Sequence, residues 1–184
     1  VFVGDKSKQD VKAIMPIVHK IKTFEAATAA LSNDALRAKT QEFKSTISEA
    51  CKALEDNIAA LYVEADTTED IDRKEEIYLE IDGLKDEVYA QTQEVLDAIL
   101  PEAYSVIKET AKRFVNNPQI EVTASPFDRE LSGTKDYVSL NGEKAFWANS
   151  WDAAGKPITW DMVHYDVQLI GGVAMHQGKI AEMH

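Results

Sequence analysis

The stretch GVAMHQGKI, residues 172–180, contains the glycines and the lysine that a phosphate-binding loop uses. Such a loop needs four residues between its first glycine and the Gly-Lys pair, followed by a Ser or Thr whose hydroxyl holds Mg²⁺. Here five residues intervene, and Ile180 carries no hydroxyl. The spacing therefore argues against a phosphate loop within these residues.

Gln168 lies just before this stretch, in an apolar helical segment. Its amide offers one acceptor and two donors, so it can accept from the N6 amine of adenine and donate to N7. Guanine carries an acceptor at O6 and cannot match that pairing. A lone glutamine on an apolar helix is also typical of a surface or helix-capping side chain. The residues alone leave both interpretations open.

Other side chains with chemical potential fit no site pattern. The histidines at 19, 164 and 176 have no cysteine partner and no HExxH spacing, so we expect no metal site. The acidic run at 64–76 lacks the glycine and the terminal glutamate spacing of a calcium loop. No local motif pairs a nucleophile with a base, and we assign no catalytic residue.

Composition narrows the class of protein. The 184 residues carry a formal net charge of −12, which disfavours a nucleic-acid partner. The single cysteine, Cys51, cannot form an internal disulfide and indicates a reducing, cytoplasmic location; we expect it to be a small buried residue on a helix face. The chain contains no run of 18 apolar residues, so we predict no membrane span.

Helical periodicity dominates the first two thirds of the chain. Val11, Ile14, Val18 and Ile21 predict a first helix to about residue 31, which Pro16 either kinks or begins. Ser32 or Asn33 caps a second helix. Its apolar stripe has spacings of 3 and 4: Leu36, Thr40, Phe43, Ile47, Ala50, Leu54, Ile58 and Leu61. After a turn in which Thr67 and Asp70 occupy capping positions, the rhythm resumes from Ile77 to Ile99, which predicts an antiparallel helical hairpin.

A further helix is predicted from Pro101, which takes its first position, to a stop at residues 116–118. Lys112 and Arg113 lie in its last turn.

After this helix the sequence changes from a helical to a β-strand pattern. Residues 119–160 are rich in β-branched and aromatic residues, and Asn141-Gly142 is a strong hairpin signal. We expect a three-stranded β-meander there. Its tryptophans, Trp147, Trp151 and Trp160, either pack the sheet against helices or form a recognition surface. A short apolar helix and a turn leading into a strand follow from Met162. The fold class is α+β and mostly α-helical.

Three stretches of the chain resemble the SecA preprotein-translocase motor ATPases. They are LSNDALRAKTQEF (31–43), LPEAYSVIKETAKRF (100–114) and HYDVQLIGGVAMHQGKIAEM (164–183). The last is similar to the family's Q motif followed by the strand that runs into its Walker A P-loop. The resemblance covers about residues 8–48, 96–115 and 162–184. It implies an N-terminal fragment that stops just before the P-loop, and His184 stands at a variable family position, so whether it is native stays open.

The resemblance divides the chain into an N-terminal helical segment (1–48), an inserted helical hairpin (49–95), a helix of the first nucleotide-binding domain (96–118), an inserted β-meander (119–161) and the Q-motif helix with the first strand (162–184). The two inserted regions stand where the family usually has short connections. Their role, and whether the fragment dimerises, stay open.

The resemblance also implies function. Gln168 would read the adenine of ATP, with Tyr165 and Met162 flanking the base. The full-length protein would use ATP and Mg²⁺ to push unfolded preproteins through the SecYEG channel, peripherally at the cytoplasmic face of the bacterial inner membrane. Phosphate-binding and hydrolytic residues are absent from these 184 residues, so we expect the fragment alone to be inactive and its nucleotide affinity to be very weak.

Two alternatives remain open at this point. The basic residues of the first helix (Lys6, Lys8, Lys12, Lys20 and Lys22) favour contact with an anionic membrane surface, but the same helix can simply pack its apolar stripe on its own domain. The whole chain can also be interpreted as a non-enzymatic module that presents a coiled-coil hairpin and an aromatic sheet to a protein partner.

Overall fold

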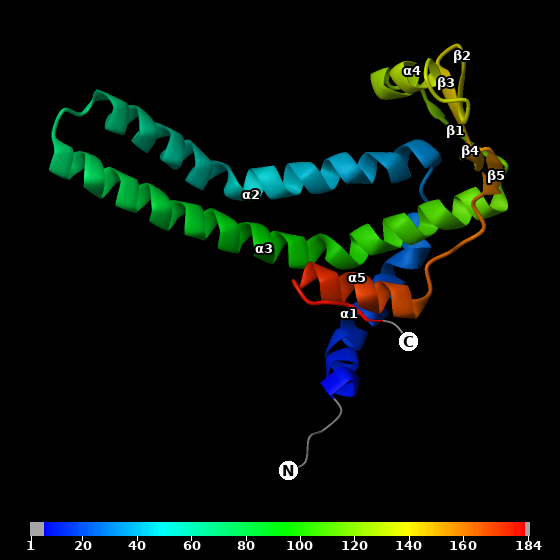
Figure 1. Ribbon diagram of the computed structural model, residues 1–184, viewed down its shortest axis with the longest axis horizontal. Coiled ribbons are helices and arrows are strands. Elements are labelled where there is room, and N and C mark those ends of the chain that lie inside the picture. Colours follow the sequence, from blue (N-terminus) through cyan, green and yellow to red (C-terminus); the bar gives the residue numbers. More distant parts are fainter. Residues whose placement is uncertain (1–5, 183–184) are drawn as a thin grey trace. The chain divides into compact units, whose positions relative to one another are not determined.

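The computed structural model describes residues 6–182 and is mostly helical, at 69%, with small antiparallel sheets (Figure 1). This confirms the α+β class. The helices are α1 (Lys6–Ala29), α2 (Asn33–Thr67), α3 (Ile71–Asn116), α4 (Pro126–Ser132) and α5 (Asp166–His176). The strands are β1 (Gln119–Thr123), β2 (Val138–Asn141), β3 (Lys144–Ala148), β4 (Ser150–Ala153) and β5 (Lys156–Thr159).

The chain folds as two compact units. The first unit combines Val1–Lys39 with Pro101–His184 and contains α1, α5 and all the strands. The second unit, Thr40–Leu100, is the helical hairpin made by α2 and the first part of α3. The predicted division at 49–95 stays a prediction, because compactness does not show which segments are insertions.

The hairpin has a core of its own, as its periodicity predicted. Leu61 and Ala65 of α2 meet Ile77 and Ile81 of α3, with Ile58 and Leu84 packed against them. Asp70 caps α3 by accepting from the backbone N–H of Asp72 and Arg73. The hairpin therefore closes through a tight turn at residues 68–70.

Two positions of the predicted stripe on α2, Thr40 and Ala50, are wrong, because both residues are exposed. Ala50 is exposed, and Cys51 is buried in its place, with only 2% exposed. The series Ile47, Cys51, Leu54, Ile58, Leu61 and Ala65 alternates spacings of 4 and 3 without interruption, which keeps one face toward α3. The Cys51 thiol lies 3.3 Å from the Thr92 hydroxyl, and its expected burial is confirmed.

For Pro16 the structure excludes one of the two predicted alternatives, and for Pro101 it corrects the prediction. α1 begins at Lys6, so Pro16 lies inside the helix and does not mark its start. Pro101 is not at the first position of a helix, because α3 runs without interruption from Ile71 to Asn116. A proline inside a helix loses the bond to the carbonyl four residues earlier. The Pro101 side chain is fully buried.

The first unit is built on α1 and the last part of α3. The α1 stripe Ile14, Val18 and Ile21 is buried as predicted, whereas Val11 is 38% exposed. Arg113 does more than interact with a helix dipole. Its guanidinium donates to the Leu31 carbonyl and to Asn33 Oδ1, each at 2.7 Å, and so holds the turn between α1 and α2 on α3. Ser32 accepts from the Ala35 N–H, which confirms a cap at this turn.

The small sheet is antiparallel, but it is not a meander. Its strand order is β1-β3-β2, with α4 inserted between β1 and β2. The predicted Asn141-Gly142 turn does join β2 to β3, with Gly142 at a φ of 59°. β4 and β5 form a separate two-stranded hairpin. Strand order depends on pairing between distant segments, which local alternation does not encode.

A buried carboxylate joins this sheet to the helices. Asp128 of α4 is fully buried and accepts two hydrogen bonds from Arg37, at 2.7 and 2.8 Å. It also accepts from Ser125 and from the Trp147 indole N–H, which places Trp147 in a packing role. Burial alone would raise the pKa of Asp128, but the hydrogen bonds from Arg37 and Ser125 and the Arg37 charge lower it to about 2.

We expect Asp128 to make stability depend on acid. Its folded pKa lies below its usual value of 3.8, so the stabilisation is fully present above about pH 4 and is lost as pH falls toward 2. The difference corresponds to about 2 kcal/mol. Denaturant unfolding of the wild type and Asp128→Asn should therefore differ at pH 7 and converge near pH 2. The exposed Asp136→Asn serves as control; an equal gap at both pH values would contradict the assignment.

Candidate functional site

The candidate site is the turn that begins α5. Tyr165 precedes the helix in an extended conformation (φ −80°, ψ 161°), and Asp166 opens its first turn. The segment before it is held by the Trp160 indole N–H, which donates to the Met162 carbonyl at 2.7 Å. Trp160 in turn lies against Trp151. Local hydrogen bonding therefore fixes the three predicted residues relative to one another.

The Gln168 amide is oriented by the backbone. Its Oε1 accepts from the Tyr165 N–H at 2.8 Å, and its Nε2 lies 3.4 Å from the Met162 sulfur. Because a backbone N–H only donates, the oxygen of the amide must face Tyr165. Gln168 is thus a capping side chain, one of the two roles that the sequence left open. One N–H of Nε2 donates to that sulfur, so a second lone pair on Oε1 and the other N–H of Nε2 remain for a ligand.

Exposed aromatic and apolar side chains lie in the same short segment as this amide. Tyr165 is 72% exposed and Met162 39% exposed. A flat aromatic base needs this combination of an oriented polar group and adjacent apolar or aromatic surface. The structure therefore brings Met162, Tyr165 and Gln168 together within seven residues, and their chemistry fits an adenine ring.

An ion pair anchors the start of α5 to α1. Lys22 Nζ lies 2.6 Å from Asp166 Oδ2, and this hydrogen bond lowers the pKa of Asp166. Both side chains are nearly half exposed, so the pair contributes little stability and acts mainly on position. The two residues are 144 positions apart, and no local pattern could have predicted their contact.

The other face of α5 is buried. Leu169 and Val173 belong to the core, and Gly172 faces Tyr104 of α3. A Cβ at position 172 would lie 2.3 Å from the Tyr104 hydroxyl oxygen, so only glycine fits there without movement. Burial raises the pKa of Tyr104. The adjacent glycines at 171 and 172 were conspicuous in the sequence, but their reason required the packing partner.

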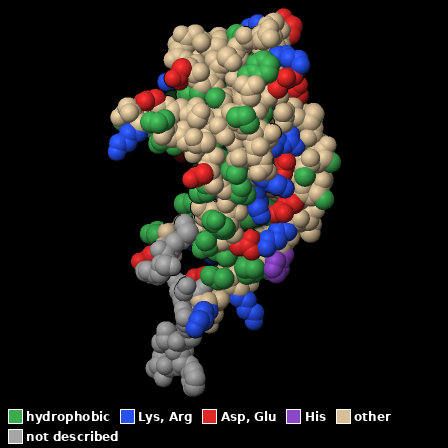
Figure 2. Space-filling model, turned by 90° about the vertical axis from the view of Figure 1, so that its right-hand side faces the viewer, with side chains coloured by type: hydrophobic (Ala, Val, Ile, Leu, Met, Phe, Trp, Pro, Cys, Tyr) green, Lys and Arg blue, Asp and Glu red, His purple; other side chains and the backbone are tan. Residues whose placement is uncertain are grey.

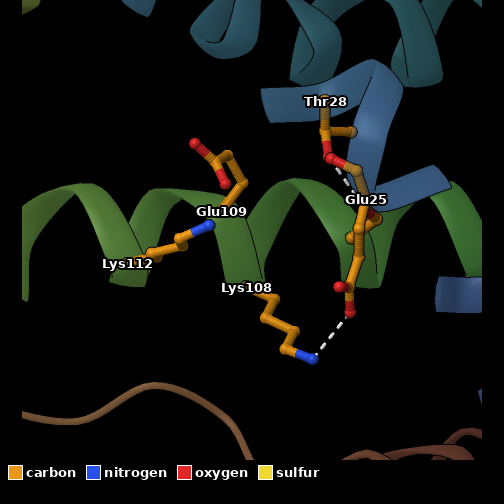
Figure 3. Close-up of a pocket in the computed structure, with 6 residues that line it drawn as sticks. Glu25, Thr28, Lys108, Glu109 and Lys112 are labelled. Atoms are coloured by element: carbon orange, nitrogen blue, oxygen red, sulfur yellow. Dashed lines mark hydrogen bonds and ion pairs between the residues drawn. The ribbon is translucent and has the colours of Figure 1, made fainter. Parts of the chain in front are cut away.

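A shallow hollow between α1 and α3 is a separate feature. Its lining is Glu25, Thr28, Ser105, Lys108, Glu109 and Lys112 (Figure 3). Lys108 and Glu25 point toward one another and pair at 2.7 Å, and the buried hydroxyls of Thr28 and Ser105 are 2.9 Å apart. These groups satisfy one another, and none of the three candidate residues lines the hollow. We assign it no ligand.

Within the described part of the chain, no three His, Cys, Asp or Glu side chains gather closely enough to hold a metal ion. Among residues 6–182, no helix is both long and apolar enough to cross a membrane. Residues 179–182 form no regular element, and Met183 and His184 lie outside the described residues. The predicted strand after α5 therefore stays a prediction.

Comparison with known proteins identifies the family. The chain matches the family model described as the SecA DEAD-like domain over residues 1–184. Its α+β fold is consistent with that domain. The chain belongs to that family. No solved structure matches it.

Three similar relatives are protein translocase subunits SecA. The chain is 66% identical over 182 residues to that of Christiangramia forsetii, 58% over 183 residues to that of Flavobacterium psychrophilum and 47% over 180 residues to that of Bacteroides fragilis. These matches cover 99%, 100% and 98% of this chain but only 16% of each relative. The matches extend through the hairpin and the sheets, so these relatives share both regions.

The close approach at Gly172 generates a stability prediction. Gly172→Ala should lower the free energy of unfolding by about 1–3 kcal/mol, because the new methyl group collides with the Tyr104 ring. Gly83→Ala is the matched control: it is also helical, has open space around its Cβ position, and should raise stability by about 0.5–1 kcal/mol. Thermal or denaturant unfolding measures both.

The contact atom can be tested separately. Tyr104→Phe removes the hydroxyl oxygen that the new methyl group would meet first. We expect it to recover part of the loss in the Gly172→Ala background. No recovery, or equal effects of the two alanine variants, would contradict the packing account.

Proposed function

We propose that the chain is part of an ATP-driven protein translocase motor, in which Gln168 recognises the adenine of ATP. Membership of the SecA DEAD-like family supports a motor of this kind. The observation that carries the site is the Tyr165 N–H bond to Gln168 Oε1, because it fixes which way the amide faces. The proposed work of the full-length protein is to push unfolded preproteins through the SecYEG channel.

The proposed pairing uses the atoms that the capping bond leaves over. Gln168 Oε1 accepts from the N6 amine of adenine through its second lone pair, and Nε2 donates to N7. Guanine would place its O6 acceptor opposite the glutamine oxygen, so the pairing selects ATP over GTP. Tyr165 and Met162 contact the base on its flanks.

Base recognition supplies only part of nucleotide binding. Phosphate affinity and hydrolysis depend on backbone N–H groups and a lysine around the phosphates, with Mg²⁺ held by a hydroxyl and a carboxylate. The sequence of these 184 residues contains no matching phosphate pattern. The proposal therefore assigns ATP hydrolysis to the full-length protein, and no catalytic residue or Mg²⁺ ligand to this chain.

The structure leaves fewer residues of α1 for contact with a membrane than the sequence suggested. The apolar residues Ile14, Val18 and Ile21 are at most 3% exposed, so the α1 stripe packs within its own unit. Lys22 is paired with Asp166. Contact with anionic lipid would then rest on the basic side of α1 alone, as a weak contribution to a peripheral position at the cytoplasmic face of the bacterial inner membrane.

One observation supports the alternative, a non-enzymatic interaction module. The hairpin is a compact unit with its own core, and it carries exposed aromatic residues. It is compatible with the motor, because a motor can carry a docking element. We therefore treat it as an additional property of the hairpin.

Substitution of Gln168 tests the nucleotide proposal in the full-length protein. Gln168→Ala should lower ATP affinity and reduce the preference for ATP over GTP by about 10-fold, since a bidentate base contact is worth roughly 1–3 kcal/mol. Titration of both nucleotides measures the preference.

Gln168→Glu is the informative comparison. Its carboxylate can still accept from the Tyr165 N–H, so the start of α5 is preserved, but it has no N–H to donate to N7. It should bind ATP more weakly but keep the preference for ATP over GTP, because N7 is common to both purines and the carboxylate still faces N6 of adenine and O6 of guanine. Its thermal stability should match that of the wild type. Unchanged nucleotide preference in Gln168→Ala, or unchanged ATP affinity in Gln168→Glu, would remove Gln168 from its proposed role.

A further inference from the structure

The charge of the chain is concentrated in one unit. Residues 40–100 contain 17 acidic and 5 basic residues, so the hairpin carries the whole net charge of −12. The rest of the chain contains 15 acidic and 15 basic residues. On the face drawn in Figure 2, acidic and basic side chains lie interspersed with hydrophobic ones. The five hairpin cations can neutralise at most five carboxylates, which leaves a large surplus.

Exposed tyrosines share one side of this hairpin. Tyr62 of α2 and Tyr78 of α3 are in edge contact, with ring centroids 6.3 Å apart. Ile71 lies seven residues before Tyr78, and Tyr89 lies eleven residues after it. Offsets of seven and eleven return a helical side chain to nearly the same side. We call Tyr62, Ile71, Tyr78 and Tyr89 the tyrosine face; their exposed fractions are 39%, 79%, 44% and 67%.

Carboxylates flank this face. Asp66 follows Tyr62 by four residues, Asp82 follows Tyr78 by four, and Asp86 precedes Tyr89 by three. Residues three or four apart are neighbours on a helix surface. All three carboxylates are exposed. Aromatic rings and negative charge are therefore interleaved along one side of the hairpin.

The chain itself shows what such a surface accepts. Lys85 Nζ lies 5.7 Å from the centre of the Tyr62 ring and 3.3 Å from Asp82 Oδ1. A cation over a tyrosine ring is attracted by the ring's electrons, and an adjacent carboxylate adds a charge-assisted hydrogen bond. This arrangement is an intramolecular example of a ring and a carboxylate binding one ammonium group.

We propose that the tyrosine face of the hairpin docks a lysine- or arginine-rich segment of a partner protein. Charge complementarity favours this occupant, because a basic segment neutralises the surplus carboxylates while its cations lie over the tyrosine rings. Tyrosine is also prominent among the residues that dominate binding energy at interfaces. A second copy of the hairpin or an anionic lipid surface would meet the surplus negative charge and be repelled. The inference does not depend on the nucleotide site.

Two double variants of the 184-residue chain separate specific docking from general attraction. Ile71→Ser with Tyr89→Ser removes the two most exposed members of the face. Val63→Ser with Leu79→Ser is the control, since these residues are 65% and 68% exposed. Val63 lies two residues from Leu61 and Ala65, and so points away from the core; Leu79 lies likewise between Ile77 and Ile81. Net charge is identical in all three proteins.

The probes are fluorescein-labelled deca-lysine and deca-arginine, titrated in about 0.15 M salt, where long-range attraction is screened. We expect binding to at least one peptide, weakened about 10-fold in the tyrosine-face variant and less than about twofold in the control. Circular dichroism must show equal helix content. Equal affinity of all three proteins, no binding of either peptide, or stronger binding to phosphatidylglycerol vesicles than to the peptides would overturn the proposal.

Discussion

The last part of α3, from Pro101 to Asn116, is the surface on which the first unit is assembled. Arg113 holds the α1–α2 turn on it, and Ser105 bonds to Thr28 of α1. Tyr104 receives Gly172 of α5, and the Phe114 carbonyl accepts from Asn149, next to the sheets. Because α5 is fixed against this helix through a glycine, the turn that carries Gln168 has a defined position. The candidate site therefore depends on packing at residues that do not take part in its chemistry.

Sequence periodicity predicted the elements that are stabilised by near neighbours. The hairpin followed from spacings of 3 and 4, because a helix stripe is a local property, and the Asn141-Gly142 turn followed from backbone preferences. The order β1-β3-β2 and the uninterrupted helix at Pro101 were not predicted. Strand order and helix continuity both depend on contacts with residues distant in the sequence, and local sequence preferences do not encode those contacts.

The site was predictable in part for the same reason. Met162, Tyr165 and Gln168 lie within one short segment, so their proximity was implied by the chain itself. Lys22, Tyr104 and Asp128 were not anticipated, because each acts through a contact across the fold. The net charge of −12 did not show where the excess lies, whereas the division into two units assigns it to the hairpin. A docking function for that unit became visible only then.

The central claim is that the start of α5 presents a glutamine amide already oriented for adenine. A structure of the full-length protein with ADP bound tests it most directly. The account predicts that Gln168 Oε1 still accepts from the Tyr165 N–H and also lies about 3 Å from adenine N6, with Nε2 at a similar distance from N7. An adenine bound elsewhere, or a Gln168 side chain turned away from the base, would contradict it.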